Sequence, residues 1–253
     1  MKENKIQPHL RLTEVSEFCL ISGNPDRVPI IASNLKESQE VASNRGLVSY
    51  SGNTPNFNVS VSVLTTGMGS PSTAIILEEA YRAGGRVFIR VGSCGALKPD
   101  MKVGDVVIPY AAIRDEGTSL NFAPLAFPAV ATPEIYEKLS RSARKLKIDF
   151  HSGIVWTTDI YYSTVKDQYK IWAKCGANSV EMESALLFVF GITKSVKIGS
   201  ILVVDGNLAE GTQKEEGISS EVDEKFLEGV QKSIECAIAA IELLWTDNPS
   251  NQK

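Results

Sequence analysis

Charged and small residues follow two apolar segments of the chain, and their types suit the binding of an anion. The segment EFCLIS, residues 17–22, is followed by Gly23 and Arg27. The segment RVFIRV, residues 86–91, contains Arg90 and runs into a loop of glycine and serine. Free backbone N–H groups at a helix start bind anions, and a guanidinium group matches phosphate oxygens. We therefore expect the two loops to form a phosphate site.

Each loop also has a plainer interpretation. Gly23 and Arg27 fit an ordinary turn with a surface arginine. Arg90 fits a salt bridge to a core carboxylate, because a buried charge without a partner is costly. Two such loops in one chain favour the phosphate interpretation more than either loop alone.

A pair of carboxylates marks a third place, in Val180-Glu181-Met182-Glu183-Ser184 before an apolar segment. A carboxylate can accept hydrogen bonds from two sugar hydroxyls while a methionine packs on the sugar ring. Alternatively, the glutamates only stabilise the first turn of a helix through its dipole. The spacing alone does not decide between these two interpretations.

Alternating strands and helices must position these residues. Strands are predicted over residues 17–22, 59–66, 86–91, 104–113, 151–157 and 197–204. One helix is predicted to start between Pro25 and Pro29 and to run through residue 42, and another to have Ser70 as N-cap with Pro71 at the first helical position. Further helices are predicted over 133–146, 165–175, 182–192 and 219–245. This alternation predicts one α/β domain around a parallel or mixed sheet, with a frayed polar tail over 246–253. Ligands of such sheets bind beyond the carboxyl ends of the strands.

The composition limits the class of protein. The chain has 253 residues, of which 43% are hydrophobic and 22% charged, and its net charge is -4. These values are typical of a globular protein, and they disfavour a general nucleic-acid binder, which is usually basic. No apolar run is long enough to span a membrane, and the start lacks the apolar stretch of a secretory signal, so we expect a cytoplasmic protein with no membrane partner.

Cysteine and histidine are too scattered for a structural metal site. The chain has four cysteines without a C-x-x-C pair, and two histidines. We therefore expect reduced thiols, no metal site and no organic cofactor.

Four motifs occur in order at the predicted strand ends, namely SGNPDR, TTGMGSPSTAIILEE, RVGSCGALKPDMKVGDVVIP and VEMESALL. Together they resemble the nucleoside phosphorylases of the uridine phosphorylase and hexameric purine nucleoside phosphorylase group, from about His9 to Leu244. The resemblance implies a three-layer α/β/α sandwich with a twisted, partly barrel-like mixed sheet, formed by a single domain over residues 1–253. It also implies the conversion of a nucleoside and phosphate to a free base and a pentose 1-phosphate, with phosphate as co-substrate.

The resemblance also implies site residues, with Arg90 and Glu183 as the central catalytic groups. Phosphate would be bound by Gly23, Arg27, Arg90, Ser93 and, from a neighbouring subunit, Arg45 in Asn44-Arg45-Gly46. Ribose would be bound by Met68, Glu181, Met182 and Glu183, with His9 reaching the neighbour's 5′-hydroxyl. The base would be bound by Cys94, Gly95, the stacking Tyr161 and Gln168. Because Arg45 and His9 would reach a neighbour's site, the resemblance implies a dimer, with three such dimers forming a hexamer.

Two departures from the family pattern concern the base. The purine enzymes place an acid where this chain has Gly206, and Asp205 comes one residue early. A shift of one residue turns a strand side chain to the other face, so Asp205 can serve as the acid only if the chain turns differently there. The glutamine and arginine that bind uracil in uridine phosphorylases fall on about Val165 and Asp167, with Gln168 nearby.

The choice of base therefore stays open, with uridine slightly favoured. The stretch over 114–124 resembles the uridine enzymes, whereas Asn44-Arg45-Gly46 and the uninterrupted segment between Tyr162 and Glu181 resemble the purine and methylthioadenosine enzymes. A nucleosidase that uses water is disfavoured, because it does not need several phosphate arginines. A non-catalytic nucleoside-binding paralogue is the remaining alternative, and the Asp205-Gly206 departure is the feature in its favour.

Overall fold

The computed structural model describes residues 5–165, 167–212 and 220–248. Its elements are β1 (Phe18–Ser22), α1 (Arg27–Ala32), β2 (Lys36–Asn44), β3 (Leu47–Asn53), β4 (Ser60–Thr65), α2 (Ser70–Arg82), β5 (Val87–Ala96), β6 (Val106–Asp115), η1 (Ser119–Asn121), β7 (Ala129–Val130), α3 (Pro133–Lys145), β8 (Phe150–Thr158), α4 (Gln168–Lys174), β9 (Ala177–Glu181), α5 (Ser184–Lys194), β10 (Lys197–Asn207), η2 (Leu208–Glu210) and α6 (Ser220–Thr246). The tail predicted over 246–253 lies largely outside the described residues.

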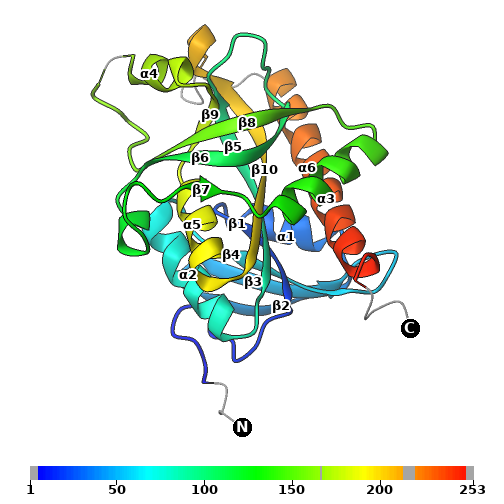
Figure 1. Ribbon diagram of the computed structural model, residues 1–253. Helices are drawn as coiled ribbons and strands as arrows, with labels where there is room; N and C mark the ends of the chain where they lie inside the picture. Colours follow the sequence, from blue (N-terminus) through cyan, green and yellow to red (C-terminus); the bar gives the residue numbers. More distant parts are fainter. Residues whose placement is uncertain (1–4, 166, 213–219, 249–253) are drawn as a thin grey trace.

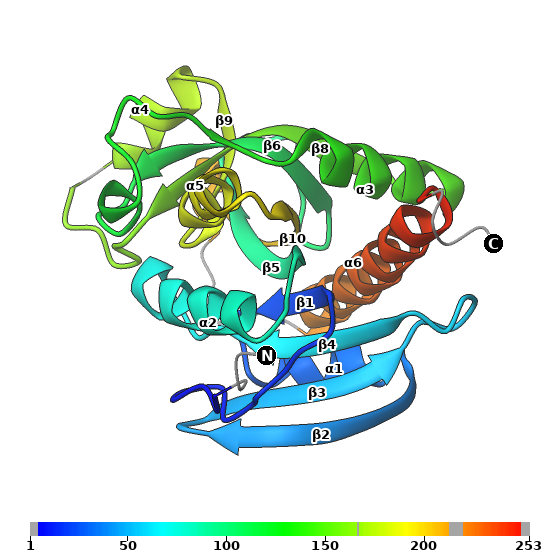
Figure 2. The ribbon, with the colours of Figure 1, turned by 60° about the horizontal axis from the view of Figure 1, so that its bottom comes forward.

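A mixed sheet, partly closed into a barrel, forms the centre of the molecule (Figure 1). Its strand order is β10-β6-β8-β9-β5-β1-β4-β3-β2, and an additional pairing of β10 with β5 closes a barrel from β5, β9, β8, β6 and β10. Strand β1 runs parallel to β4 on one side and to β5 on the other. Beyond β4, the antiparallel strands β3 and β2 extend the sheet away from the barrel (Figure 2).

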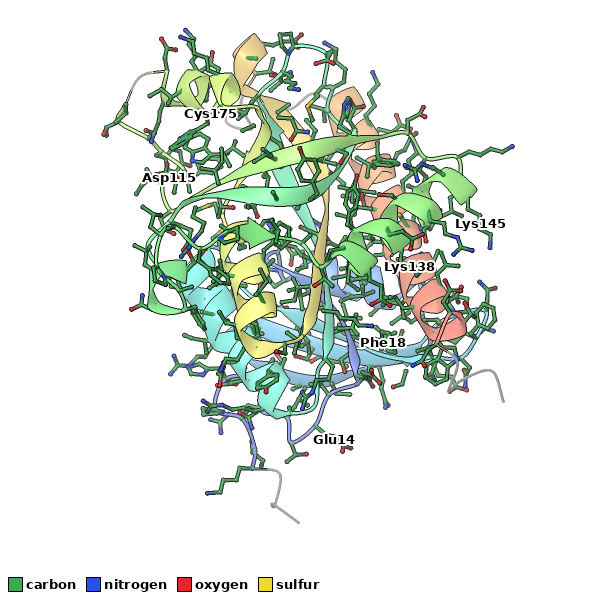
Figure 3. The ribbon with its side chains drawn as sticks, viewed as in Figure 1. Glu14, Phe18, Asp115, Lys138, Lys145 and Cys175 are labelled. Atoms are coloured by element: carbon green, nitrogen blue, oxygen red, sulfur yellow. The ribbon has the colours of Figure 1, made fainter. Side chains whose placement is uncertain are left out.

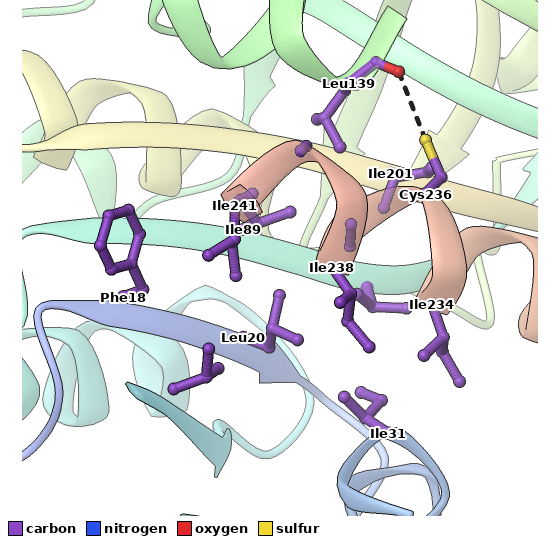
Figure 4. Close-up of a cluster of buried hydrophobic side chains, with 14 of the residues drawn as sticks. Phe18, Leu20, Ile31, Ile89, Leu139, Ile201, Ile234, Cys236, Ile238 and Ile241 are labelled. Carbon is purple, nitrogen blue, oxygen red and sulfur yellow. Dashed lines mark hydrogen bonds between the residues drawn. The ribbon is translucent and has the colours of Figure 1, made fainter. Parts of the chain in front are cut away.

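Helices cover the sheet from both sides, as in a three-layer sandwich (Figure 2). Residues of α1, α3 and α6 share one hydrophobic cluster with β1, β4, β5 and β10, and residues of α2 and α5 share another with the opposite faces of these strands. Figure 4 shows part of the first cluster, where Ile234, Ile238 and Ile241 of α6 pack over the sheet. Each such buried aliphatic side chain stabilises the fold by about 1.5–3 kcal/mol. The predicted fold class is therefore confirmed.

The helix predicted to start between Pro25 and Pro29 and to run through residue 42 is confirmed at its start, but its continuation is wrong. Helix α1 ends at Ala32, and Lys36–Asn44 forms strand β2, which pairs antiparallel with β3. The turn between them consists of Arg45 and Gly46, both in the left-handed region with φ of 54° and 77°. Such two-residue turns match the twist of a hairpin. The hairpin pairing therefore overrides the helix-forming residues of this stretch, and the sequence prediction also missed β3 and β9.

Two element boundaries differ from the prediction near the expected site. Strand β5 does not end before Gly92 but continues to Ala96, because its last residues pair with both β10 and β9. Helix α2 begins at Ser70 with Gly69 as the N-cap, one residue earlier than predicted. In the described part of the chain, no helix combines the length and apolar character that a membrane span requires.

Candidate active site

Arg90 is the centre of a buried ionic cluster on β5. Its side chain is 7% exposed, its Nη2 lies 2.5 Å from Oε2 of Glu183, and its Nε lies 3.4 Å from Oε2 of Glu181. A Cβ atom at Gly92 would lie 2.6 Å from the Arg90 Cζ. Because the two glutamates hold the guanidinium group in this position, only glycine fits at residue 92.

Glu181 holds the cluster together. Its carboxylate accepts hydrogen bonds from the backbone N–H groups of Glu183 and Ser184 and from the Thr157 hydroxyl, at 2.6–3.0 Å. The first N–H groups of a helix lack partners within the helix, so this carboxylate stabilises the start of α5. These contacts orient Glu183 and Arg90, and the predicted contact of Glu181 with ribose stays a prediction.

Glu183 faces the glycine-rich loop before α2. Its Oε1 accepts a hydrogen bond from the backbone N–H of Gly69 at 2.6 Å, and its Oε2 contacts Arg90. Burial raises the pKa of Glu183 above its usual value, the nearby Glu181 adds to this effect, and Arg90 opposes it. The carboxylate is therefore held by a backbone donor on one side and a guanidinium group on the other.

The first loop reaches the same cluster, as predicted. A Cβ atom at Gly23 would lie 3.7 Å from Nη1 of Arg90 and 3.8 Å from Oε1 of Glu183. Arg27 is buried at the start of α1, and its Nη1 donates to the backbone carbonyl of Val91 at 3.4 Å. Burial and the charge of Arg90 lower the pKa of Arg27 to about 10. The salt bridge of Arg90 to core carboxylates is therefore present, and the first loop lies beside it. The binding of phosphate between them stays a prediction.

The end of β5 carries the predicted phosphate hydroxyl and two predicted base contacts. Ser93 is half-buried and pairs with Val203 of β10. Cys94 is buried, and burial raises the pKa of its thiol well above the usual value, with further contributions from Asp205 and Glu181. A Cβ atom at Gly95 would lie 2.7 Å from a methyl carbon of Leu208, so the backbone of β5 and the residues after β10 approach closely here.

Asp205 lies in a β-bulge of β10. Val204 pairs with Cys94 and Gly206 pairs with Gly95, so Asp205 is an extra residue in the ladder. A bulge bends the strand and changes the direction of a side chain. The charge of Asp205 raises the pKa of Arg27 and of Cys94, which places it in the electrostatic environment of the cluster. Because of this bulge, the chain at Asp205 departs from a regular strand. Such a departure is the condition, stated in the sequence analysis, under which Asp205 could serve as the acid.

The predicted stacking residue Tyr161 lies on the loop that leads into α4, and the predicted amide residue Gln168 is the first residue of that helix. The side chains of Tyr161 and Tyr162 are exposed and meet edge to face, with ring centroids 4.9 Å apart. Gln168 accepts a hydrogen bond from the Ser163 hydroxyl at 2.9 Å. Figure 3 shows Asp115, at the carboxyl end of β6, on the same side of the molecule as Cys175, which follows α4.

The two predicted methionines lie on the loops around Glu183. Met68, between two glycines with positive φ, is 82% exposed. The backbone carbonyl of Met182 accepts a hydrogen bond from the Ser70 hydroxyl at 2.9 Å. This bond ties the start of α2 to the loop that carries Glu183.

His9 and Arg45 form a second group. The Asn44 side chain donates to the His9 carbonyl at 2.9 Å, and Arg45 is the next residue, at the tip of the β2–β3 turn. The Nδ1 atom of His9 lies 2.6 Å from Oε1 of Glu79 on α2. The structure therefore brings together the two residues that the resemblance assigns to a neighbour's site.

Several functional neighbours were missed by the sequence analysis. They are Gly69, whose N–H binds Glu183; Gly92, which accommodates Arg90; Thr157, which binds Glu181; and Glu79, which binds His9. The glycines had a signal, since they lie in motifs already singled out. Glu79 also lies at the end of such a motif, but nothing within the motif points to its contact with His9. Thr157 had no signal, because its contact with Glu181 joins distant segments. Within the described residues, no group of three or more His, Cys, Asp or Glu side chains is arranged to hold a metal ion.

Comparison with known proteins places this chain in a family. The sequence pattern of the Phosphorylase superfamily matches residues 17–242. A guanosine phosphorylase of Halorubrum lacusprofundi is 34% identical over 244 residues, covering 94% of this chain and 99% of that protein. A uridine phosphorylase of Treponema pallidum is 34% identical over 255 residues, covering 95% of this chain and 94% of that protein.

A solved structure agrees with these relatives. The crystal structure of purine nucleoside phosphorylase from Toxoplasma gondii, in complex with immucillin-H, superimposes with a TM-score of 0.86 at 31% identity, covering 96% of this chain and 98% of that one. The resemblance inferred from the four motifs is therefore confirmed over nearly the whole chain. In both sequence and fold, the chain belongs to the Phosphorylase superfamily, among relatives named as nucleoside phosphorylases.

Proposed function

We propose that this protein is a phosphate-dependent nucleoside phosphorylase of the cytoplasm, needing no metal or organic cofactor. The observation that carries the proposal is the convergence of Gly23, Arg27 and Arg90 with the buried carboxylate of Glu183. This arrangement combines an anion site with an acceptor for sugar hydroxyls. A protein that only binds nucleosides has no need for the phosphate arginines.

The reaction needs positioning and charge rather than a covalent intermediate. Glu183 accepts the ribose hydroxyls and fixes the sugar, while Arg27, Arg90 and Ser93 hold phosphate below the ring. As the bond from C1′ to the base nitrogen breaks, its electron pair goes to the base and the sugar gains positive charge. A phosphate oxygen stabilises this charge and forms the new bond to C1′.

The decisive assay is a panel of uridine, inosine, adenosine and methylthioadenosine, each with and without phosphate. A phosphorylase releases the base and a pentose 1-phosphate only when phosphate is present. Release of free pentose without phosphate would indicate a nucleosidase, and tight binding without turnover would indicate a nucleoside-binding protein.

The base is the least determined part of the substrate. Gly206 at the position of the purine acid and the uridine-like stretch over 114–124 favour uridine slightly. A purine nucleoside is the second candidate, and the β-bulge at Asp205 is the specific observation in its favour. A positioned acid accelerates departure of a purine by protonating N7, whereas uracil leaves more readily as a delocalised anion.

Replacing Asp205 by alanine distinguishes the two candidates. If Asp205 is the displaced acid, kcat on inosine falls by a factor of about 10² to 10⁴ while turnover of uridine is spared. If the enzyme is a uridine phosphorylase, both substrates change little and the wild-type rates already favour uridine. Initial rates on both substrates at saturating phosphate measure the difference. Loss on inosine alone would contradict the uridine assignment.

The charge of the site supports a contribution from a second copy of the chain. The carboxylates of Glu181, Glu183 and Asp205 outnumber the guanidinium groups of Arg27 and Arg90 in this cluster. Binding a phosphate anion therefore calls for a further cation. We propose that Arg45 of a second copy supplies it, with His9 of that copy beside it, and that such dimers assemble into a hexamer.

A complementation experiment tests this sharing. Arg45→Ala alone and Arg90→Lys alone should each be nearly inactive. After the two variants are dissociated and reassociated together, about one site in four should regain activity, because half of the pairs are mixed and each mixed pair has one intact site. Sedimentation gives the state of assembly. No recovery in mixed pairs, or full activity of a monomer, would contradict a shared site.

A further inference from the structure

Glu79 is a buried carboxylate on α2 for which the reaction described above has no use. It is 5% exposed, and its contacts are with the N-terminal segment. Its Oε2 accepts hydrogen bonds from the backbone N–H groups of His9 and Leu10, each at 2.9 Å. Its Oε1 lies 2.6 Å from Nδ1 of the His9 ring. One carboxylate therefore fixes both the backbone and the ring of His9.

This contact determines which nitrogen of His9 carries hydrogen. A carboxylate only accepts hydrogen bonds, so Nδ1 must be the protonated nitrogen that faces it. In the neutral ring, Nε2 is then bare and acts as an acceptor. Asn44, which donates to the His9 carbonyl at 2.9 Å, holds the backbone from the other side.

We propose that Glu79 is a positioning residue that presents Nε2 of His9 as the acceptor for the 5′-hydroxyl of the nucleoside. The enzyme would therefore prefer nucleosides with a 5′-hydroxyl over 5′-deoxy and 5′-thioether nucleosides, which have no hydrogen to donate. The proposal rests on the proposed function, in which His9 reaches the ribose bound by a second copy. The preference for a 5′-hydroxyl would distinguish a phosphorylase of ordinary nucleosides from a phosphorylase of methylthioadenosine.

Glu79→Gln tests the role of the carboxylate with almost no change in shape. The amide oxygen can replace Oε2 and keep the two backbone N–H groups, which leaves the amide NH₂ facing Nδ1. The His9 ring must then accept at Nδ1 and carry its hydrogen on Nε2. We expect kcat/KM for a 5′-hydroxyl nucleoside to fall about 10-fold, because a charge-assisted hydrogen bond network is lost. For the matching 5′-deoxynucleoside it should change less than about 2-fold.

Two further variants provide controls. Glu78→Gln alters the adjacent glutamate, which pairs with Arg82 and Lys194 at the surface, and should leave the ratio of the two substrates unchanged. In a His9→Asn background, Glu79→Gln should cause no further loss on the 5′-hydroxyl substrate, since the two residues act together. Equal losses on both substrates would show that Glu79 supports only the fold and would overturn the proposal.

A second readout does not depend on turnover. His9 and His151 are the two histidines of the chain, so ¹⁵N solid-state NMR of protein labelled only at histidine shows both rings. His151 contacts Asp105 through Nε2 at 2.9 Å and serves as an internal reference for the opposite tautomer. At about pH 9 we expect His9 to carry its hydrogen on Nδ1 in the wild type and on Nε2 in Glu79→Gln. An unchanged His9 spectrum would overturn the proposal for Glu79, whatever the activity of the protein. Absence of phosphorylase activity in the wild type would instead contradict the proposed function.

Discussion

Replacing Arg90 by lysine is expected to lower kcat/KM for phosphorolysis by a factor of about 100 or more while the protein stays folded. Lysine keeps a positive charge next to Glu181 and Glu183 but loses the planar fork that can bind two carboxylates and a phosphate together. The KM for phosphate should rise and kcat should fall. Initial rates over a range of phosphate concentrations measure both values.

Lysine is more informative here than alanine. Arg90→Ala would leave the buried carboxylates of Glu181 and Glu183 without their cationic partner, which costs about 3–5 kcal/mol and by itself threatens the fold. Arg86→Lys is the matched control, because Arg86 is exposed and directly precedes the same strand. Thermal unfolding confirms that each variant is folded. A folded Arg90→Lys protein with near wild-type turnover would show that the phosphate assignment is wrong.

Glu183→Gln is expected to lower kcat/KM on ribonucleosides by a factor of about 100, because an acceptor for two hydroxyls becomes half donor. A 2′-deoxyribonucleoside has one hydroxyl fewer to lose, so its kcat/KM should fall only about 10-fold. The same variant also breaks the ion pair with Arg90, which affects both substrates alike. The ratio of the two losses therefore reports the sugar contact.

Glu242→Gln controls for the general cost of changing a buried carboxylate. Glu242 lies on α6 and accepts hydrogen bonds from the backbone and the side chain of Asn56. It should lower stability and leave the ratio of the two substrates unchanged. If Glu183→Gln reduces both substrates equally, Glu183 is not the acceptor of the 2′-hydroxyl.

Patterns of neighbouring residues were sufficient to predict an element or a site segment where the relevant residues lie within one motif. The loops at Gly23 and Arg90, the Glu183 motif and most strands near the barrel were found from patterns within a few residues, and the structure places the three segments next to one another. Their binding of phosphate and ribose stays a prediction. The predicted continuation of the first helix to residue 42 failed because pairing with β3 decides the conformation of Lys36–Asn44. No spacing within that stretch reports the partner strand.

The features that the sequence could not predict depend on contacts between distant segments. Whether Asp205 turns toward or away from the site depends on a bulge that appears only when β10 pairs with β5. In the same way, Glu79 and His9 are far apart in the sequence, and their contact exists only once the N-terminal segment lies against α2. Such features need the fold before they can be interpreted.

The position of β2 has a consequence for behaviour at high concentration. Pairing of β10 with β5 closes one end of the described sheet, which leaves β2 as an open edge, together with the two-residue strand β7 beside β6. An open edge is a template for strand-to-strand aggregation. Strand β2 carries exposed Lys36, Glu37 and Glu40, and its register with β3 shifts twice. These charges and irregularities discourage uncontrolled fibre growth along the edge, which leaves the surfaces around Arg45 and His9 available for the closed assembly proposed above.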